Sequence, residues 1–412
     1  MAHPFLASRD FRALFLGDVV VTIAERYFVL TFSWWLLSGP EASGQRLSLL
    51  LALESVPMLA VGLLAGPLIE RANKKHAMLG SIIIQATVTI VVAVLMARDA
   101  LTFPLLCVAG LLLGCAIPVF EGASTAALPQ AVDEPTLAAA AAMQSSTLEF
   151  SNIAAASVSA ALLAAGSMKL AVAVNAALYV AGLLVVLRLR AATFAPVPGD
   201  GTYADDLKAG ITFITGRPAL AAFVTIYILK LAIFVSLLVF IPMLVQAALG
   251  GAVRWVAILE TLFSLGAIAT AIGLSVRRSR TGLYPGYAAA LALLGGLMVL
   301  TSTLAQPAPL AAIVTLMGAC AAWLLASSNI LFHEAVPDDM KSRFFGILDT
   351  LAAAATPVGY AVVGAAFGVA NVQGVLTANG LALVALGALV LVVPRVDLGS
   401  RTVVAGLSGG AA

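Results

Sequence analysis

Apolar stretches that are long enough to cross a lipid bilayer follow one another along almost the whole chain. A membrane-spanning helix needs about 20 consecutive, mainly apolar residues. Breaking the chain at polar residues and at Gly/Pro clusters leaves twelve such segments. The pattern therefore predicts an all-α membrane protein with twelve transmembrane helices. The predicted helices cover residues 11–38, 46–69, 76–97, 101–126, 136–166, 168–189, 218–248, 252–276, 282–305, 308–332, 343–368 and 371–393.

The composition agrees with this fold class. Hydrophobic residues make up 62% of the 412 residues and charged residues only 10%, whereas soluble domains carry about 25% charged residues. A net charge of +2 gives no indication of nucleic-acid binding. The chain has no GxxxxGK[ST] loop, and its three histidines lack metal-ligand spacing. We therefore expect no cofactor, no bound metal and no enzymatic activity.

Basic residues lie mainly on one side of the predicted bundle. Most of the 22 Lys and Arg residues fall at the two termini and at the even-numbered connections between helices. By the positive-inside rule, both termini are expected to be cytoplasmic. The compact, Ala-rich chain without large loops is typical of a bacterial inner-membrane protein. We expect a monomer surrounded by membrane lipid.

The longest polar connection separates six predicted helices from the next six. Residues 1–190 are expected to form an N-terminal half, and residues 218–412 a C-terminal half with a short tail. Residues 191–217 form the linker. Within it, Ile211 and Ile214 recur at helical spacing among charged residues, which predicts a short amphipathic helix on the cytoplasmic surface. A plain solvated linker is the alternative.

An internal repeat supports this division into two pseudo-symmetric halves. Residues 51–74 in the second predicted helix align without gaps to residues 257–280 in the eighth, which places Glu54 over Glu260. Many secondary transporters consist of two six-helix halves related by a repeat. They hold their substrate between the halves, near the bilayer midplane.

The stretch GPLIERANKK, residues 66–75, ends the second predicted helix on the cytoplasmic side. It resembles the loop signature of the major facilitator superfamily, which combines a glycine, an acidic residue four positions later and several basic residues. The resemblance implies a charge network that closes the cytoplasmic face of a transporter. Simple anchoring by the positive-inside rule explains only the last two lysines. The matching residues are Gly66, Glu70, Arg71, Lys74 and Lys75.

This signature departs from the usual family pattern at two positions. Glu70 stands where the family usually has Asp, and Asn73 stands where it has Gly. Asn tolerates the left-handed backbone conformation that Gly would supply. The second departure is therefore mild.

Further stretches are similar to the twelve-helix exporter group that includes macrolide efflux pumps and the enterobactin exporter. They include FRALFLGDVVVTIAERYFVL near the N-terminus and VPDDMKSRFFGILDTL before the eleventh predicted helix. The resemblance implies a proton-coupled antiporter that exports an amphipathic small molecule, such as a drug or siderophore, by alternating access. Two alternatives remain open: a lipid or lysolipid flippase of the same fold, and a membrane scaffold or sensor that transports nothing.

Eight ionisable side chains lie well inside the predicted helices. Each charge costs about 2.5–3.5 kcal/mol near the bilayer centre, so such residues usually face a cavity or one another. With six acids and two bases, the group favours a cationic substrate or protons. The eight residues are Asp18, Glu25, Arg26, Glu54, Glu149, Lys230, Glu260 and Asp349.

Among the acids, Glu25 and Glu149 are the leading candidates for proton carriers, with Asp18 third. Asp18 and Glu25 are seven residues apart and share nearly one helix face. Arg26 lies about 100° further round the helix than Glu25. Adjacent helical residues do not face each other, so we expect Arg26 and Glu25 to meet different helices. A buried acid that only hydrogen-bonds its neighbours is the alternative for Glu149.

The remaining candidates are expected to line a substrate cavity. Lys230 has two interpretations: neutralisation of a buried acid, which we favour, and binding of an acidic substrate group. An interfacial charge partner is an equal alternative for Asp349. We expect Glu121 to lie at the end of the fourth helix, as a cap or against the Gly66–Lys75 turn. The cavity residues are Arg26, Glu54, Asn152, Lys230, Glu260 and Asp349.

Overall fold

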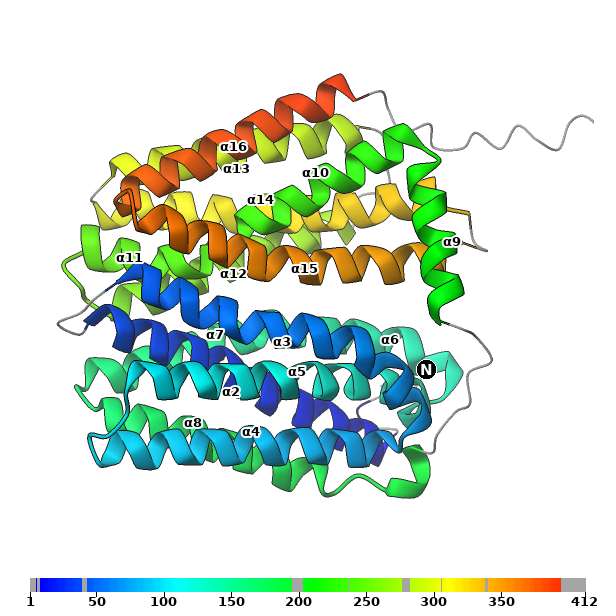
Figure 1. Ribbon diagram of the computed structural model, residues 1–412, viewed down its shortest axis with the longest axis vertical. Helices are drawn as coiled ribbons and strands as arrows, with labels where there is room; N and C mark the ends of the chain where they lie inside the picture. Colours follow the sequence, from blue (N-terminus) through cyan, green and yellow to red (C-terminus); the bar gives the residue numbers. More distant parts are fainter. Residues whose placement is uncertain are drawn as a thin grey trace, which may run out of the picture.

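The computed structural model describes residues 5, 8–38, 43–194, 203–235, 237–275, 282–304, 306–337 and 340–393. Within these residues every regular element is a helix (Figure 1). The all-α fold predicted from the hydrophobic pattern is therefore confirmed. The helices are α2 (Arg9–Ser38), α3 (Gly44–Arg71), α4 (Lys74–Ala97), α5 (Phe103–Ala131), α6 (Glu134–Ser145), α7 (Thr147–Ala164), α8 (Met168–Val186), the 3₁₀ helix η1 (Ala191–Phe194), α9 (Tyr203–Thr215), α10 (Pro218–Phe234), α11 (Leu237–Ala248), α12 (Arg254–Ser275), α13 (Leu283–Thr303), α14 (Pro307–Ala335), α15 (Lys341–Phe367) and α16 (Val372–Val392).

The described part of the chain contains ten helical segments that are long and apolar enough to cross a membrane. The bent pair α10 and α11, with an angle of 41° between them, makes an eleventh. Helix α2 is 30 residues long, about 45 Å at 1.5 Å per residue, but its internal charges lower its hydropathy. With α2 added, the described spans are consistent with the twelve predicted helices.

Two predicted spans are interrupted rather than continuous. The fifth is divided into α6 and α7 at Ser146, whose hydroxyl donates a hydrogen bond to the Ala142 carbonyl oxygen at 3.0 Å. Hydroxyl side chains compete with the helix in this way for backbone groups. Glu149 consequently lies in the first turn of α7. The seventh predicted span is divided into α10 and α11.

The helices form two bundles that lie side by side (Figure 1). In one bundle α3 packs against α5, and α4 against α5 and α8. In the other, α12 packs against α14 and α13 against α16. A side chain at Gly114 would collide with the backbone carbonyl of Glu54, and one at Gly318 with that of Phe263. In both bundles a glycine therefore allows two helix backbones to approach closely.

The two bundles contact each other closely at one end, which we call the sealed end. Helix α3 packs against α15, α7 against α12, and α11 against α2. Gln246 donates a hydrogen bond to the hydroxyl of Ser38 across the bundles at 3.4 Å. Leu30 and Trp34 of α2 pack against Val245 and Val256 of the other bundle.

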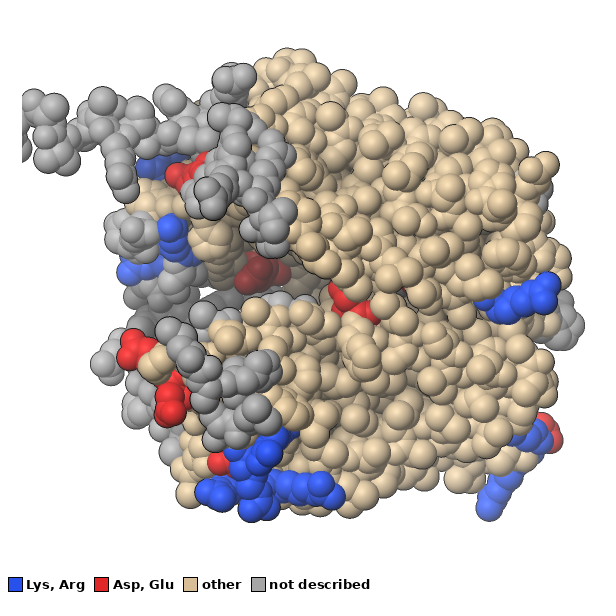
Figure 2. All heavy atoms as spheres, turned by 180° about the vertical axis from the view of Figure 1, so that it is seen from behind, with Lys and Arg blue, Asp and Glu red and all other residues tan. Residues whose placement is uncertain are grey.

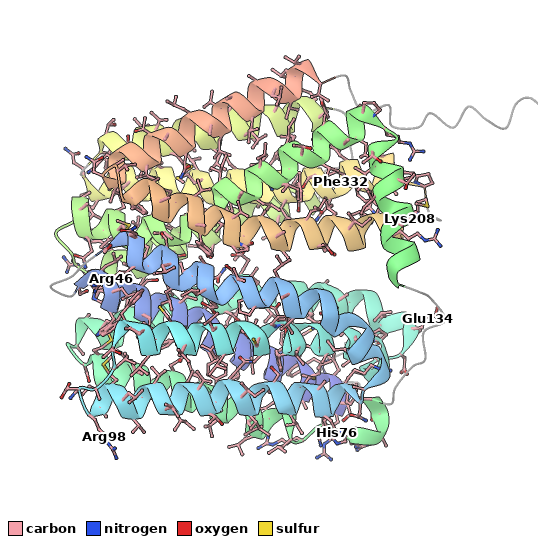
Figure 3. All side chains as sticks on the ribbon, viewed as in Figure 1. Arg46, His76, Arg98, Glu134, Lys208 and Phe332 are labelled. Carbon is pink, nitrogen blue, oxygen red and sulfur yellow. The ribbon has the colours of Figure 1, made fainter. Side chains whose placement is uncertain are left out.

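The opposite end carries α9, and we call it the α9 end. There α9 lies across the bundle and packs on α15, with the rings of Phe213 and Phe344 edge to face at 6.4 Å (Figure 1). Lys208 and His76 also lie at this end, whereas Arg46 and Arg98 lie at the sealed end (Figure 3). Figure 2 shows that the surface is hollowed between the bundles toward the α9 end, with acidic side chains inside the hollow. The chain is therefore closed at one end and open at the other.

Candidate functional site

Arg26 faces acidic residues from three helices in the interior of the first bundle. It is half-buried in the middle of α2. It interacts electrostatically with Glu25 on its own helix, with Glu54 on α3 and with Glu121 on α5. We call these four residues the Arg26 cluster. One guanidinium group thus faces three carboxyl groups.

Glu25 is buried within the Arg26 cluster, with 9% of its surface exposed. Its Oε1 atom and the Nε atom of Arg26 have no hydrogen-bond partner among the described residues. No salt bridge joins the two side chains, because adjacent residues of a helix point in different directions. In the described part of the chain a salt bridge is found elsewhere, between Lys169 and Asp99 at 2.8 Å. The buried charges of the cluster are therefore only partly compensated.

The close packing of α3 on α5 brings Glu54 and Glu121 into this cluster. Gly114 allows α5 to approach the backbone of Glu54, and Glu121 follows about two turns later on α5. Glu121 is exposed to solvent and still interacts with Arg26, Glu25 and Asp18. It therefore faces the interior of the bundle rather than lipid.

The expectation that Glu121 caps the end of its helix was wrong, whereas packing near the Gly66–Lys75 stretch stays a prediction. Helix α5 does not end near residue 126 but continues to Ala131, whose carbonyl oxygen accepts a hydrogen bond from the Ser8 hydroxyl at 2.6 Å. Glu121 therefore lies inside the helix and belongs to the Arg26 cluster. Sequence reasoning missed it because the polar residues after it resemble a helix end. An acid flanked on both sides by helical, apolar residues was the signal that could have found it.

A chain of hydrogen bonds connects Asp18, next to the Arg26 cluster on α2, to α6. Ser124 donates to Oδ1 of Asp18 at 2.9 Å, and Gln144 donates to the Ser124 hydroxyl at 3.2 Å. Asp18 also interacts electrostatically with Glu25 and Glu121. Asp18 lies closer to the α9 end than Glu25. Its carboxylate accepts a hydrogen bond from Ser124, whereas Oε1 of Glu25 has no donor among the described residues.

Glu149 and Glu260 lie in different bundles, on two helices that contact each other. They lie on α7 and α12, which pack together, and they interact electrostatically. Oε2 of Glu149 and Oε1 of Glu260 are buried without a hydrogen-bond partner among the described residues. Glu260 also interacts with Arg26. The charge distribution around Arg26 therefore extends from the first bundle into the second.

Lys230 on α10 is not paired with any of these acids. Its side chain is 4% exposed, and Nζ lies 4.5 Å from the centroid of the Tyr227 ring. None of the described carboxylates lies within ion-pair distance of Nζ. In this conformation no such acid neutralises Lys230. The other role expected for Lys230, binding of an acidic substrate group, is considered below.

The two remaining residues predicted to line the cavity, Asn152 and Asp349, lie on different helices. Asn152 is half-buried on α7, one turn after Glu149. Asp349 is exposed on α15 and interacts electrostatically with Tyr227. Asp349 therefore interacts with a residue of the second bundle and not with the Arg26 cluster.

The signature at residues 66–75 forms the tight connection between α3 and α4. The side chains of Glu70 and Arg71, and the surroundings of Gly66, lie outside the described residues. Lys74 is buried, and Nζ of Lys75 donates a hydrogen bond to the Leu187 carbonyl oxygen just after α8 at 3.0 Å. Lys75 thus satisfies one of the carbonyl groups that a helix end leaves free.

Asn73 does not use the left-handed conformation that Asn tolerates. Asn73 has φ −70° and ψ 119°, an extended conformation, and its side-chain oxygen accepts a hydrogen bond from the His76 N–H at 3.4 Å. Asn is a preferred residue at the start of a helix because its side chain satisfies such an N–H. The side chain, rather than backbone freedom, explains Asn at this position.

The sequence profile of transmembrane secretion effectors matches residues 3–403. The chain belongs to this family. It is a membrane transporter of the major facilitator type and not an enzyme. The superfamily resemblance read from Gly66–Lys75 is thereby confirmed. No curated protein matches the sequence significantly.

Solved structures of other transporters share the fold at low sequence identity. The nucleoside transporter NupG superposes with a TM-score of 0.76 at 13% identity, covering 93% of this chain and 99% of that one. A POT family transporter in complex with 5-aminolevulinic acid gives 0.76 at 10% identity, covering 95% and 97%. A bacterial homolog of the human lysosomal transporter Spinster, in an inward-facing and occupied conformation, gives 0.74 at 14% identity, covering 97% and 98%.

Proposed function

We propose that this transporter is a proton-coupled exporter of an amphipathic small molecule that carries a positive charge. The observation that supports this most is the Arg26 cluster, in which three carboxyl groups of the first bundle interact electrostatically with one guanidinium. A bound proton or a bound cation would each remove the same uncompensated negative charge. The two ligands therefore compete, which is the requirement for antiport.

The roles within the site follow from burial and hydrogen bonding. Glu25 is the main proton carrier because it is buried and one of its oxygens has no partner among the described residues. Glu121, which is exposed to solvent, meets the cationic group of the substrate first. Glu149 carries a second proton opposite Glu260, and Asp18 connects the site to the α9 end through Ser124.

Alternating access supplies the mechanism. The sealed end is closed by contacts between α3 and α15 and between α7 and α12, while the bundles are separated toward the α9 end. Rocking of the bundles would open the first end and close the second around a fixed central site. In this proposal the α9 end is cytoplasmic, both termini are cytoplasmic, and the monomeric protein resides in a bacterial inner membrane. Residues 66–75 form the gate at the α9 end.

The test is uptake into inside-out proteoliposomes, with the α9 end facing outward and an acidic lumen. A panel of fluorescent cationic, neutral and anionic amphiphiles is screened with the wild-type protein. We expect accumulation of cationic members, and Glu25→Gln is expected to lower the gradient-driven rate about tenfold or more. Exchange of substrate in the absence of a proton gradient should continue, because the variant loses only the binding and release of the coupling proton.

Glu134→Gln provides the matched control, since Glu134 is an exposed glutamate at the α9 end, distant from the cluster (Figure 3). This control should transport like the wild type. Wild-type uptake that runs equally fast with and without the proton gradient would rule out proton coupling. Accumulation that requires the opposite orientation of the protein would rule out export.

A further inference from the structure

Lys230 lies at a structurally unusual place in the second bundle. It is on α10, one turn before this helix ends at Phe234 and the span bends by 41° into α11. Interrupted membrane helices often contribute to substrate sites, because their helix ends and unwound backbone groups can point at a ligand. The position of Lys230 near the middle of the span therefore fits a binding role.

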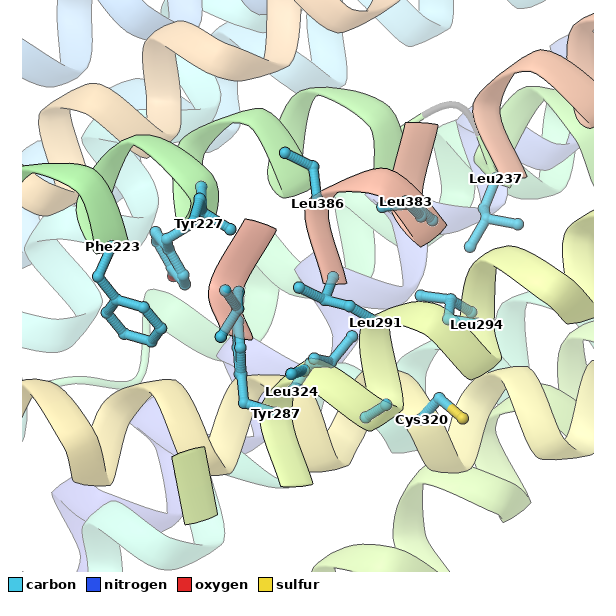
Figure 4. Close-up of a cluster of buried hydrophobic side chains, with 14 of the residues drawn as sticks. Phe223, Tyr227, Leu237, Tyr287, Leu291, Leu294, Cys320, Leu324, Leu383 and Leu386 are labelled. Carbon is cyan, nitrogen blue, oxygen red and sulfur yellow. The ribbon is translucent and has the colours of Figure 1, made fainter. Parts of the chain in front are cut away.

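The surroundings of Lys230 are mainly aromatic and apolar. Tyr227, whose ring lies beside the ammonium group, belongs to a hydrophobic cluster with Phe223, Tyr287 and Leu324 (Figure 4). An attraction between a desolvated cation and an aromatic face offsets only part of the free energy lost on burial. Lys230 thus remains incompletely compensated, in contrast to Arg26 with its three neighbouring acids.

One exposed acid interacts with the tyrosine that contacts this lysine. Asp349 on α15 is exposed and interacts electrostatically with Tyr227. Helix α15 packs directly against α10. Tyr227 thus contacts the cation of Lys230 and interacts with the anion of Asp349. We call these three residues the Lys230 site.

We infer that the Lys230 site binds an anionic group of the transported molecule, most simply a carboxylate. The apolar part of the molecule then packs on the Tyr227 ring, while its cationic group faces Asp349 and the acids of the first bundle. The substrate class is accordingly zwitterionic amphiphiles. This inference rests on the proposed function, because it concerns the molecule that is carried.

Three dansyl probes test the charge requirement one group at a time. Nε-dansyl-lysine differs from dansylcadaverine only by its carboxylate, and dansylaminohexanoate carries the carboxylate without the amine. Binding to purified protein in phosphatidylcholine nanodiscs is measured by energy transfer from tryptophan to dansyl. We expect Nε-dansyl-lysine to bind about tenfold more tightly than dansylcadaverine, the size of a charge-assisted hydrogen bond.

Two variants separate a binding role from a structural one. Lys230→Met should abolish the advantage of Nε-dansyl-lysine and leave dansylcadaverine binding unchanged, whereas Lys230→Arg should retain it. In the absence of probe, Lys230→Met should also raise the Tm by a few degrees, because an apolar side chain replaces an incompletely compensated buried cation. A fall in Tm, or an equal loss of affinity for all probes, overturns the inference.

The anionic headgroup of a lipid is the alternative ligand for Lys230. The measurement is repeated in nanodiscs that contain phosphatidylglycerol, where the carboxylate preference should persist. If phosphatidylglycerol removes the Lys230-dependent preference, lipid occupies the site and the assignment to substrate is wrong. Because binding is measured without a proton gradient, failure of proton-driven export would leave this result unaffected. Equal wild-type affinity for Nε-dansyl-lysine and dansylcadaverine overturns the inference and leaves proton coupling untouched.

Discussion

A disulfide between positions 48 and 364 is expected to stop transport completely, and reduction of the disulfide is expected to restore it. Ser48 on α3 and Gly364 on α15 belong to different bundles and meet near the sealed end; a Cβ atom at Gly364 would lie 3.0 Å from that of Ser48. Natural disulfides have Cβ atoms about 3.5–4.5 Å apart, so a shift of a few tenths of an ångström is sufficient. The bond would hold the sealed end closed and prevent alternating access.

The experiment uses Ser48→Cys with Gly364→Cys in a background without the native Cys107, Cys115 and Cys320. Transport is measured after mild oxidation and again after addition of a reductant. Ser48→Cys alone is the control, and its transport should not respond to oxidation. If the cross-linked protein transports as fast as the reduced protein, the bundles do not separate at this end and the rocking mechanism is wrong.

Gly114→Leu is expected to prevent stable folding of the first bundle. Any side chain at Gly114 would collide with the carbonyl oxygen of Glu54 and approach Pro57 of α3. Overpacking of a tight contact costs about 1–3 kcal/mol and occasionally more. We expect the upper end of this range, because backbone atoms rather than flexible side chains stand in the way. The measurement is the yield of monodisperse protein in detergent together with its Tm.

Gly80→Leu is the matched control, since nothing lies within 4 Å of a Cβ atom at Gly80. This variant should keep the wild-type yield and Tm. Gly318→Leu should reproduce the defect in the second bundle, where the backbone of Phe263 blocks the added side chain. Normal folding of Gly114→Leu would show that α3 and α5 can separate without loss of stability.

The resemblance of the two bundles was recognisable in the sequence only through α3 and α12. The gap-free alignment placed Glu54 over Glu260, and the structure places both among the charges that interact with Arg26. The same sequence comparison could not show that Glu260 interacts with Glu149. That pairing depends on the contact between α7 and α12, which joins residues more than a hundred positions apart.

The sequence alone determined the helical membrane fold, most helix boundaries and the presence of charges inside the bilayer. These properties follow from local hydrophobicity and from the free energy of placing a charge in lipid, which depend on each segment by itself. Tertiary structure alone decided which charges meet. It placed Glu121 in the Arg26 cluster and left Lys230 without an acid within ion-pair distance among the described residues. Such contacts depend on how helices rotate and pack, and periodicity along one chain carries no information about the facing helix.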